Sequence, residues 1–408
     1  MERYNEYKDS GELWLGEIPS HWGLRRTKYV WKETDSRSEF GSEQLLSVSQ
    51  YDGVREAQSD SRSESLKGYK IVKQDELVIN IMLAWLGGLG VSKHEGIVSP
   101  AYCVYKLQDA QNPRFLHYLY RTPMYLAEFA RHSTGIVPSR WRMYTDDFGE
   151  VLTLLPPIEE QDAMVAYLDT ATAKIDEAIA QQQKMIDLLN ERKQIIINNA
   201  VTKGLNPDVP MKDSGVDWIG EIPEHWELMQ YRHLFYNLDK LRQPISADQR
   251  SRNNPQYDYY GASGVIDKID YYNVEDKVLL IGEDGANLLL RNLPLIYKAE
   301  GKFWVNNHAH ILKPIRDDYD FMAYVMEAAD YTLFITGSAQ PKLSQSNLNA
   351  VKLPIPPLEE QKSIVEHLAQ RTEKLDTAIS NATKQISLLQ ERKQIIINDV
   401  VTGKVKVC

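Results

Sequence analysis

The stretch LPPIEEQDAMVAYLDTATAKIDEAIAQQQKMIDLLNERKQIIIN occupies residues 155–198, and IPPLEEQKSIVEHLAQRTEKLDTAISNATKQISLLQERKQIIIN occupies residues 355–398. Both copies end on the same eight letters, ERKQIIIN. A shorter pair lies upstream of each copy: KDSGELWLGEIPSHW begins at Lys8, and KDSGVDWIGEIPEHW begins at Lys212. The chain is therefore an internal repeat in which constant stretches alternate with variable ones.

Each long constant stretch has the pattern of an extended helix. A proline pair starts it, and two glutamates place negative charge in the first turn, where the helix dipole favours it. Apolar and small residues then recur at spacings of three and four, which is typical of a coiled-coil seam. The predicted seam is Leu168, Thr172, Ile175, Ile179, Gln182, Ile186, Leu189, Lys193, Ile196 and Ala200, with equivalents 200 positions later. We predict helical regions over residues 156–203 and 356–408 that pair as an antiparallel coiled coil.

The three consecutive isoleucines of ERKQIIIN cover more of the helix than a seam needs. Ile196 lies on the seam, whereas Ile195 and Ile197, like Ile395 and Ile397 in the second copy, point away from it. Two interpretations stay open. Either these four side chains form a contact surface for another protein, or globular domains of the same chain cover them.

Composition sets broad limits on the kind of protein. The chain has 408 residues, 43% hydrophobic and 25% charged, which predicts a soluble protein with at least two domains. Its start is polar, no apolar run could span a bilayer, and its only cysteines are Cys103 and Cys408. These features favour the cytoplasm, with no membrane partner. A net charge of −10 requires any nucleic-acid site to be a local basic patch or to be completed by a partner.

The variable segments, 23–154 and 227–354, share an order of expected elements but not their letters. Strands are expected over residues 75–85 and 101–107 in the first segment and over 276–285 and 308–314 in the second. Amphipathic helices are expected over residues 115–132 and 321–337, each followed by a glycine-bearing loop. We therefore expect α+β domains over residues 1–155 and 204–355, related by a pseudo-twofold repeat and separated by the two helical regions.

The paired signatures WLGEIPSHW and WIGEIPEHW, the proline-pair starts of the helices and the ERKQxII ends resemble the specificity subunit of type I restriction-modification enzymes. The resemblance covers essentially the whole chain. It implies two target-recognition domains, each of which reads one half of a split, asymmetric sequence in double-stranded DNA. It also implies that the helices set the gap between the halves and dock two adenine methyltransferase subunits, which carry two ATP-dependent restriction subunits. The chain itself would be non-catalytic and free of cofactors, with S-adenosylmethionine, ATP and Mg expected in the partner subunits.

Candidate DNA-contacting residues lie in polar loops of the variable segments, because amide, hydroxyl, amine and guanidinium groups read bases and phosphates. In the first segment they are Arg131, Ser139, Arg140 and Arg142; in the second they are Gln249, Arg250, Arg252, Asn253, Asn254, Gln340, Lys342, Ser344 and Gln345. The tryptophans and histidines of the paired signatures are expected to be structural instead.

Two other classes of protein compete with this interpretation. Asp284, Glu300 and Lys302 have the order of a metal-dependent nuclease motif, although Gly301 between the last two favours a turn. His308 and His310 could be two metal ligands, but the sequence offers no third. A coiled-coil adaptor that does not bind DNA is the remaining alternative, and it predicts no salt-dependent affinity for a duplex.

Overall fold

The computed structural model describes residues 2–51, 53–57, 65–137, 140–250, 254–337 and 340–407. The chain divides into two compact units. Unit 1 comprises Met1–Gln183 together with Lys384–Cys408, and unit 2 comprises Lys184–Thr383. Each unit thus contains one variable segment and part of both constant helical stretches. No helix in the described ranges has the length and apolar character that a membrane span requires.

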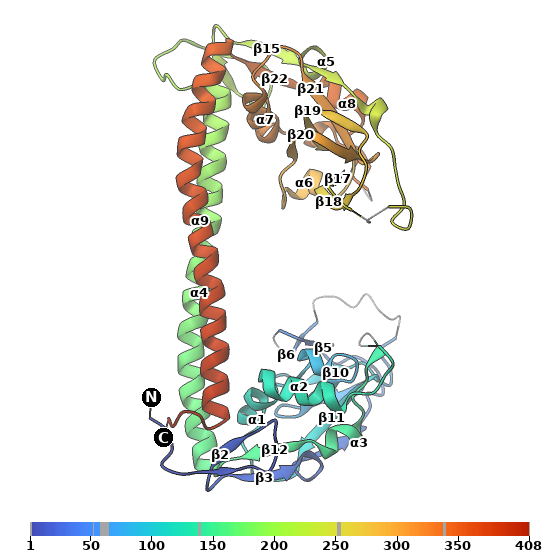
Figure 1. Ribbon diagram of the computed structural model, residues 1–408, viewed down its shortest axis with the longest axis vertical. Coiled ribbons are helices and arrows are strands. Elements are labelled where there is room, and N and C mark those ends of the chain that lie inside the picture. Colours follow the sequence, from blue (N-terminus) through green and yellow to red (C-terminus); the bar gives the residue numbers. More distant parts are fainter. Residues whose placement is uncertain are drawn as a thin grey trace. The chain divides into compact units, whose positions relative to one another are not determined.

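Two long helices, α4 (Ile158–Lys203) and α9 (Leu358–Val401), pack side by side in each unit (Figure 1). Every predicted seam residue of both helices is buried or half-buried, which confirms the predicted pairing. In unit 1, Lys393 Nζ lies 2.7 Å from an Asp176 carboxylate oxygen, and in unit 2 Lys193 Nζ lies 2.6 Å from Asp376. Also in unit 1, Leu168, which precedes Asp176 on α4, clusters with Val400, which follows Lys393 on α9. Residue numbers therefore rise along one helix as they fall along the other. The helices therefore run antiparallel.

The glutamates at the start of each long helix hold the duplicated signatures. In unit 1, Glu160 accepts a hydrogen bond from Trp22 Nε1 at 3.1 Å and lies 2.6 Å from His21 Nε2. In unit 2, Glu360 makes the same contacts with Trp226 and His225, at 3.1 and 2.9 Å. Both tryptophans are buried, as their predicted structural role requires.

The glutamine that follows each glutamate ties the long helix to a helix of the adjoining domain. Gln161 is fully buried, and its Oε1 accepts from the backbone N–H of Asn112, the N-cap of α1 (Pro113–Tyr120). Gln361 accepts equally from Asp318, the N-cap of α7 (Tyr319–Ala328). Each glutamine also donates to a proline carbonyl, Pro156 or Pro356, so its polar atoms are satisfied in the core.

The main sheet of unit 1 has the antiparallel order β4-β11-β8-β9, and three two-stranded pairs and a hairpin accompany it. The strands of this sheet are β4 (Trp31–Thr34), β11 (Tyr102–Leu107), β8 (Leu77–Asn80) and β9 (Leu89–Val91). The pairs are β1 (Tyr7–Asp9) with β2 (Glu17–Pro19), β3 (Gly23–Arg26) with β12 (Leu152–Leu155), β7 (Lys70–Val72) with β10 (Gly96–Val98), and the hairpin β5 (Leu46–Ser49) with β6 (Gly53–Glu56).

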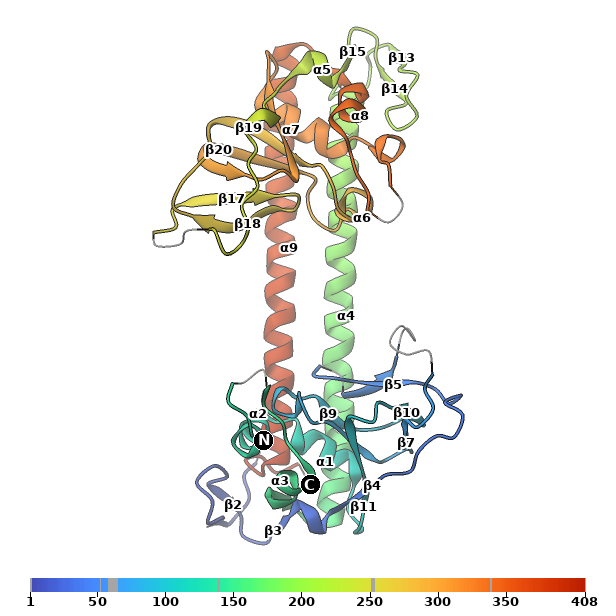
Figure 2. The ribbon, with the colours of Figure 1, turned by 90° about the vertical axis from the view of Figure 1, so that its right-hand side faces the viewer.

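The main sheet of unit 2 contains a core of the same order, β16-β21-β19-β20, and two strands extend it at the β20 edge (Figure 2). Its strands are β16 (Phe235–Asn237), β21 (Ala309–Pro314), β19 (Val274–Gly282), β20 (Ile296–Val305), β17 (Tyr257–Gly261) and β18 (Gly264–Ile269). The two-stranded pairs are β13 (Met211–Asp213) with β14 (Glu221–Pro223) and β15 (Glu227–Gln230) with β22 (Lys352–Ile355).

The helix predicted over residues 115–132 is two helices, α1 and α2 (Pro123–His132). Pro123 cannot continue α1, and Thr122 instead caps the N-terminus of α2, so the single-helix prediction was wrong. The helix predicted over residues 321–337 likewise ends at Ala328 and is followed by a short turn, η5 (Thr332–Phe334). The remaining short helices of the described ranges are η1 (Thr27–Tyr29), η2 (Ala84–Leu86), α3 (Thr145–Glu150), α5 (Tyr231–Leu234), η4 (Asp239–Leu241), α6 (Asn287–Leu290) and α8 (Gln345–Ala350).

The last turns of each long helix enter a domain core. In unit 2, Ile197 is 4% exposed and clusters with Leu368 and Trp226, and in unit 1 Ile397 is 8% exposed and clusters with Leu168. Of the two interpretations of the off-seam isoleucines, burial in the chain's own domains therefore holds for Ile197 and Ile397. These two side chains cannot form an outward surface for another protein. Their neighbours Ile195 and Ile395 are 53% and 51% exposed, and for them a partner surface stays a prediction.

Candidate nucleic-acid interface

Each unit carries one loop whose two ends are tied together by a pair of backbone hydrogen bonds. In loop A (residues 134–142), Thr134 and Arg142 exchange N–H to carbonyl bonds of 2.9 Å in both directions. In loop B (residues 336–342), Thr336 and Lys342 exchange bonds of 2.9 and 2.8 Å. These are the two glycine-bearing loops that the sequence predicted, and each is closed at its base.

A glycine makes each closure possible. A Cβ atom on Gly135 would lie 2.6 Å from the carbonyl oxygen of Arg140, and one on Gly337 would lie 2.5 Å from that of Gln340. Gly337 also has φ +86°, a conformation that side chains disfavour. Each loop thus folds back onto its own glycine at the same point, and no larger residue fits there without a backbone shift.

The next residue fixes each loop to the main sheet region of its unit. The N–H of Met143 donates to Ile81 O at 3.0 Å after loop A, and the N–H of Leu343 donates to Glu283 O at 2.7 Å after loop B. Met143 and Leu343 are both buried. Each loop is therefore anchored in the fold at its downstream end.

The basic side chains of loop A differ in how they are held. Arg131, at the end of α2, forms two hydrogen bonds with the nearly buried Glu128, and Arg142 Nη1 donates to Trp141 O at 2.8 Å. Arg140 is exposed, and its guanidinium has no hydrogen bond or ion pair with the part of the chain that the structure describes. Ser139 lies outside the described residues.

The polar side chains of loop B and the start of α8 also divide into held and free groups. Lys342 Nζ lies 3.1 Å from Glu283, and Ser344 caps α8 by accepting from the N–H of Asn347. Gln340 and Gln345 are exposed, and no side-chain partner is found for either within the described ranges.

The polar stretch around residues 247–260 is less available for DNA than its composition predicts. The Arg250 guanidinium stacks over the Tyr259 ring, 4.3 Å from its centroid, and Nη1 lies 3.2 Å from Asp267. With 16% of its side chain exposed, Arg250 helps to hold the strand pair β17–β18. Gln249 and Asn254 are exposed. Arg252 and Asn253 lie outside the described residues.

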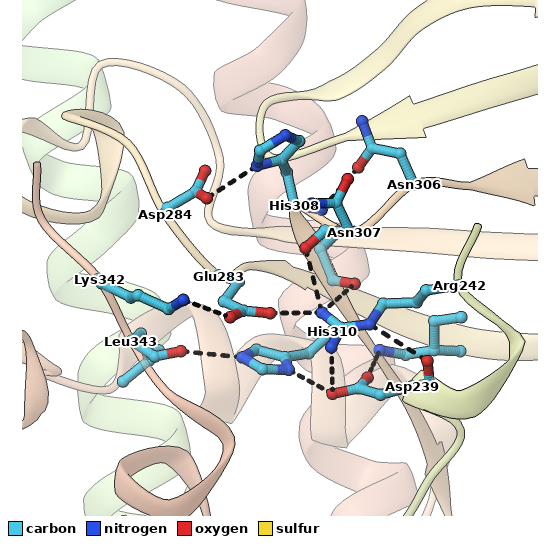
Figure 3. A network of polar contacts seen from close by, with 12 residues as sticks. Asp239, Arg242, Glu283, Asp284, Asn306, Asn307, His308, His310, Lys342 and Leu343 are labelled. Carbon is cyan, nitrogen blue, oxygen red and sulfur yellow. Dashed lines mark hydrogen bonds and ion pairs between the residues drawn. The ribbon is translucent and has the colours of Figure 1, made fainter. Parts of the chain in front are cut away.

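A charged network that the sequence did not reveal contacts Lys342 of loop B and the following residue, Leu343 (Figure 3). His310 on β21 is fully buried; its Nδ1 lies 2.6 Å from an Asp239 carboxylate oxygen and its Nε2 lies 2.8 Å from Leu343 O. Because both neighbours are acceptors, an imidazolium that donates from both nitrogens satisfies the geometry. Arg242 pairs with both Asp239 and Glu283, which links His310 to Lys342 of loop B.

The carboxylates of this network are held in their charged forms. Burial alone would raise the pKa of Asp239, but His310, the N–H of Ile311 and Arg242 outweigh it and hold that pKa below its usual value. Burial also opposes ionisation of Glu283, and Arg242 and Lys342 likewise keep its pKa low. Loop B is therefore connected to buried carboxylates that are paired with basic side chains. The alternating pattern of a strand does not predict such pairs, because the partners lie far apart in the sequence.

The arrangement of β19 and β20 separates the residues of the nuclease alternative. Glu300 pairs across the hairpin with Lys277, whereas Asp284 lies beyond the opposite end of β19 and contacts His308 at 2.7 Å. Seven strand positions separate Lys277 from Asp284, a span of roughly 23 Å. The three side chains therefore do not meet, and the metal-dependent nuclease alternative has no support. Among the described residues, no group of three or more His, Cys, Asp or Glu side chains is placed to hold a metal ion.

Comparisons with known proteins agree on one family. Residues 223–387 match the family model of the type I restriction modification DNA specificity domain. A Methanocaldococcus jannaschii protein assigned as the MjaX type I restriction enzyme specificity subunit is 24% identical over 96% of both chains. The MjaVIII specificity subunit of the same organism is 26% identical over 64% of this chain and 63% of its own.

A solved structure from work on complex assembly and conformational transition in the type I R-M system has the same fold. It superposes with a TM-score of 0.66 over 95% of this chain and 99% of its own, at 14% sequence identity. Residues 223–387 thus match a type I restriction modification DNA specificity domain, and over nearly its whole length the chain is similar to a protein named as a type I restriction enzyme specificity subunit.

Proposed function

We infer that this chain is the subunit that recognises the DNA sequence for a type I restriction-modification complex. The match to a DNA specificity domain over residues 223–387 carries this inference. The closed loops support it, because each presents exposed polar side chains on an anchored backbone, which is what reading base edges requires. The chain works without catalysis of its own, in the cytoplasm where the DNA is accessible.

We further propose a division of labour between two target-recognition domains, over residues 1–155 and 204–355. The helical regions, 156–203 and 356–408, complete a pseudo-twofold repeat, and each recognition domain reads one half of an asymmetric target. Support comes from contacts that occur once in each unit: Glu160 with Trp22 and Glu360 with Trp226, Asp176 with Lys393 and Asp376 with Lys193. A matched framework with unlike loops suits two unlike half-sites.

The partners on this proposal are double-stranded DNA, two adenine methyltransferase subunits and, through them, two ATP-dependent restriction subunits. The exposed Ile195 and Ile395 are the candidate contacts for the methyltransferase subunits. S-adenosylmethionine, ATP and Mg belong to those partners. The methyltransferase flips the target adenine out of the duplex, and this chain places it on the correct sequence.

A segment exchange tests the division of labour. Residues 23–154 are replaced by the corresponding segment of another specificity subunit, and methylated adenines are mapped across a host genome that carries the complete system. We expect one half of the methylated sequence to change while the other half and the gap stay the same. An unchanged sequence would refute a reading role for this segment, and a change in both halves would refute the division.

An insertion tests whether the helices set the gap. Seven residues added to both α4 and α9, between residues 184 and 185 and between 384 and 385, lengthen each helix by about 10.5 Å. This length corresponds to roughly three base-pair steps. We expect the gap in the methylated sequence to grow by about that number with both half-sites unchanged, and an unaltered gap would contradict the proposal.

The adaptor alternative is tested by binding of the methyltransferase complex to duplex DNA at several salt concentrations. A DNA-reading complex loses affinity steeply as salt rises, because Lys and Arg contacts release counterions from the phosphates. Omitting this chain should remove the preference for the target sequence. A preference that survives without it would favour the adaptor.

A further inference from the structure

Arg140 in loop A and Gln340 in loop B occupy the same structural position. In each loop the carbonyl of this residue is the one that lies against the closing glycine, at 2.6 Å and 2.5 Å from the position of a Cβ atom. Two residues later, Arg142 or Lys342 pairs its backbone with Thr134 or Thr336. The backbone at Arg140 and Gln340 is thus fixed at its carbonyl and just downstream of it. Both side chains therefore extend from a backbone whose conformation is already set.

The polar side chains near Arg140 and Gln340 that the structure describes are already engaged. Arg131 is held by Glu128, and Arg142 bonds to the carbonyl of Trp141. In unit 2, Lys342 is held by Glu283, and Ser344 caps α8. A side chain that must first break an internal contact reads a base less well than one that is free, because the lost contact offsets the new one.

Among the described residues, Gln345 is the other exposed polar side chain next to loop B for which no side-chain partner is found, but its counterpart in unit 1 is engaged. The residue at the same place there, Thr145 at the start of α3, bonds to Tyr105 and Glu33. Arg140 and Gln340 are therefore the matched pair of free long polar side chains on the two loops.

The chemistry of these two side chains selects different bases. In the major groove, an arginine guanidinium donates two parallel hydrogen bonds to O6 and N7 of guanine. A glutamine amide donates its N–H to N7 of adenine and accepts from the N6 amino group through its carbonyl oxygen. We propose that Arg140 reads a guanine in the half-site of the first recognition domain and that Gln340 reads an adenine in that of the second. The proposal rests on the proposed function. The adenine that Gln340 reads is distinct from the methylated one, which leaves the stack during the reaction.

The test exchanges the two side chains in the complete system. Variants R140Q and Q340R are expressed with the partner subunits, and methylated adenines are mapped genome-wide. We expect R140Q to lose about tenfold or more of its selectivity for G·C at one position of one half-site, with a shift toward A·T. Q340R should shift one position of the other half-site from A·T toward G·C. The half-site that each variant leaves unchanged is its internal control.

A second control is R25Q, which removes an exposed arginine of β3 in unit 1 that pairs with Asp109. It should leave both half-sites unchanged. If R140Q methylates the wild-type sequence with unaltered selectivity at every position, the proposal is overturned. It is also overturned if R140Q weakens methylation equally for all base substitutions, because that result describes a phosphate contact.

A variant that no longer methylates is resolved by competition binding. The purified complex with Arg140→Lys, which keeps the charge and can still donate to guanine, is measured against duplexes with each base pair of the first half-site changed in turn. A discrimination that falls at a single G·C pair supports the proposal, and uniform discrimination at wild-type levels overturns it. The segment exchange of residues 23–154 distinguishes a failure of this inference from a failure of the proposed function. If that exchange changes one half-site but R140Q leaves the methylated sequence unchanged, only the inference about Arg140 is refuted.

Discussion

Units 1 and 2 agree in detail where the chain enters a long helix and differ where the main sheet meets its loop. At the helix starts, Glu160 and Glu360 hold a tryptophan and a histidine with nearly equal distances, and the following glutamines hold the N-cap of α1 or α7. At the loops, unit 2 has the buried His310 network beneath loop B. Loop A is instead flanked by a contact of Trp141 with Trp85, whose ring centroids lie 5.2 Å apart.

This difference separates two tasks. Contacts that are the same in both units cannot make the units read different DNA, so they serve to join each domain to its helices. Contacts found in one unit can set what that unit recognises. A change at a shared contact should therefore have equal effects in both units, and a change at an unshared contact should affect one half-site only.

The largest expected effect comes from the shared tryptophans. Trp22→Ala and Trp226→Ala each remove a fully buried ring together with the donor to Glu160 or Glu360, and each should lower the free energy of unfolding by about 3–5 kcal/mol. Denaturant titration of the full chain measures the loss. Alanine at the half-buried Trp14 and Trp218 is the matched control and should cost less. A much larger loss at one buried tryptophan than at its counterpart would show that the contacts of Trp22 with Glu160 and of Trp226 with Glu360 are not equivalent.

A change in the unshared network should destabilise unit 2 alone. His310→Ala leaves Asp239 without its closest partner and should lower the free energy of unfolding by about 3 kcal/mol. The loss stays at the lower end of the range for broken buried pairs because Arg242 and the N–H of Ile311 still contact Asp239. Since His310 also contacts Leu343, the variant should loosen loop B.

Amide hydrogen exchange locates that second effect. We expect faster exchange at the N–H groups of Lys342 and Leu343, which donate to Thr336 and Glu283, and unchanged exchange at Arg142 and Met143 in unit 1. Faster exchange in loop A as well would show that the network is not specific to unit 2.

The sequence predicted the long helices well because their period persists over many turns, so each seam residue is supported by several others. Strands β11, β19 and β21 were also predicted, from short apolar runs. The helix break at Pro123 was not predicted, because apolar residues recur at helical spacing on both sides of the proline. In the structure the missing N–H of Pro123 ends α1, and the Thr122 cap starts α2.

The candidate site was less predictable. A loop composition shows that polar residues are present but not which of them already have partners. Arg250 is engaged by Asp267, 17 positions away, and Arg131 by Glu128 on its own helix. His310 meets Asp239 across 71 positions, a distance in sequence over which a single chain gives no pairing signal. The burial of Ile197 depends on a domain core that a heptad pattern does not describe.

Acid should weaken the charged network around Asp239 and Glu283. The folded state holds the pKa values of Asp239 and Glu283 below their usual values, so their contribution is present above about pH 4 and is lost as pH falls through the folded pKa values. Thermal unfolding of the full chain between pH 6 and pH 3 measures this slope. Asp239→Asn should lower stability at pH 6 but flatten the slope, and a slope as steep as that of the wild type would contradict the assignment.

The smallest expected effect tests the equivalence of the helix pair. Lys193→Ala and Lys393→Ala each remove one ion pair, with Asp376 or Asp176, whose carboxylate side chains are both 53% exposed. Because water screens such pairs, each variant should lose only about 0.2–1 kcal/mol of unfolding free energy, and less at high salt. The two losses should be equal within error, and the double variant should lose their sum, since the two pairs share no residue. Unequal losses would show that the helices pack differently in the two units despite their matched sequences.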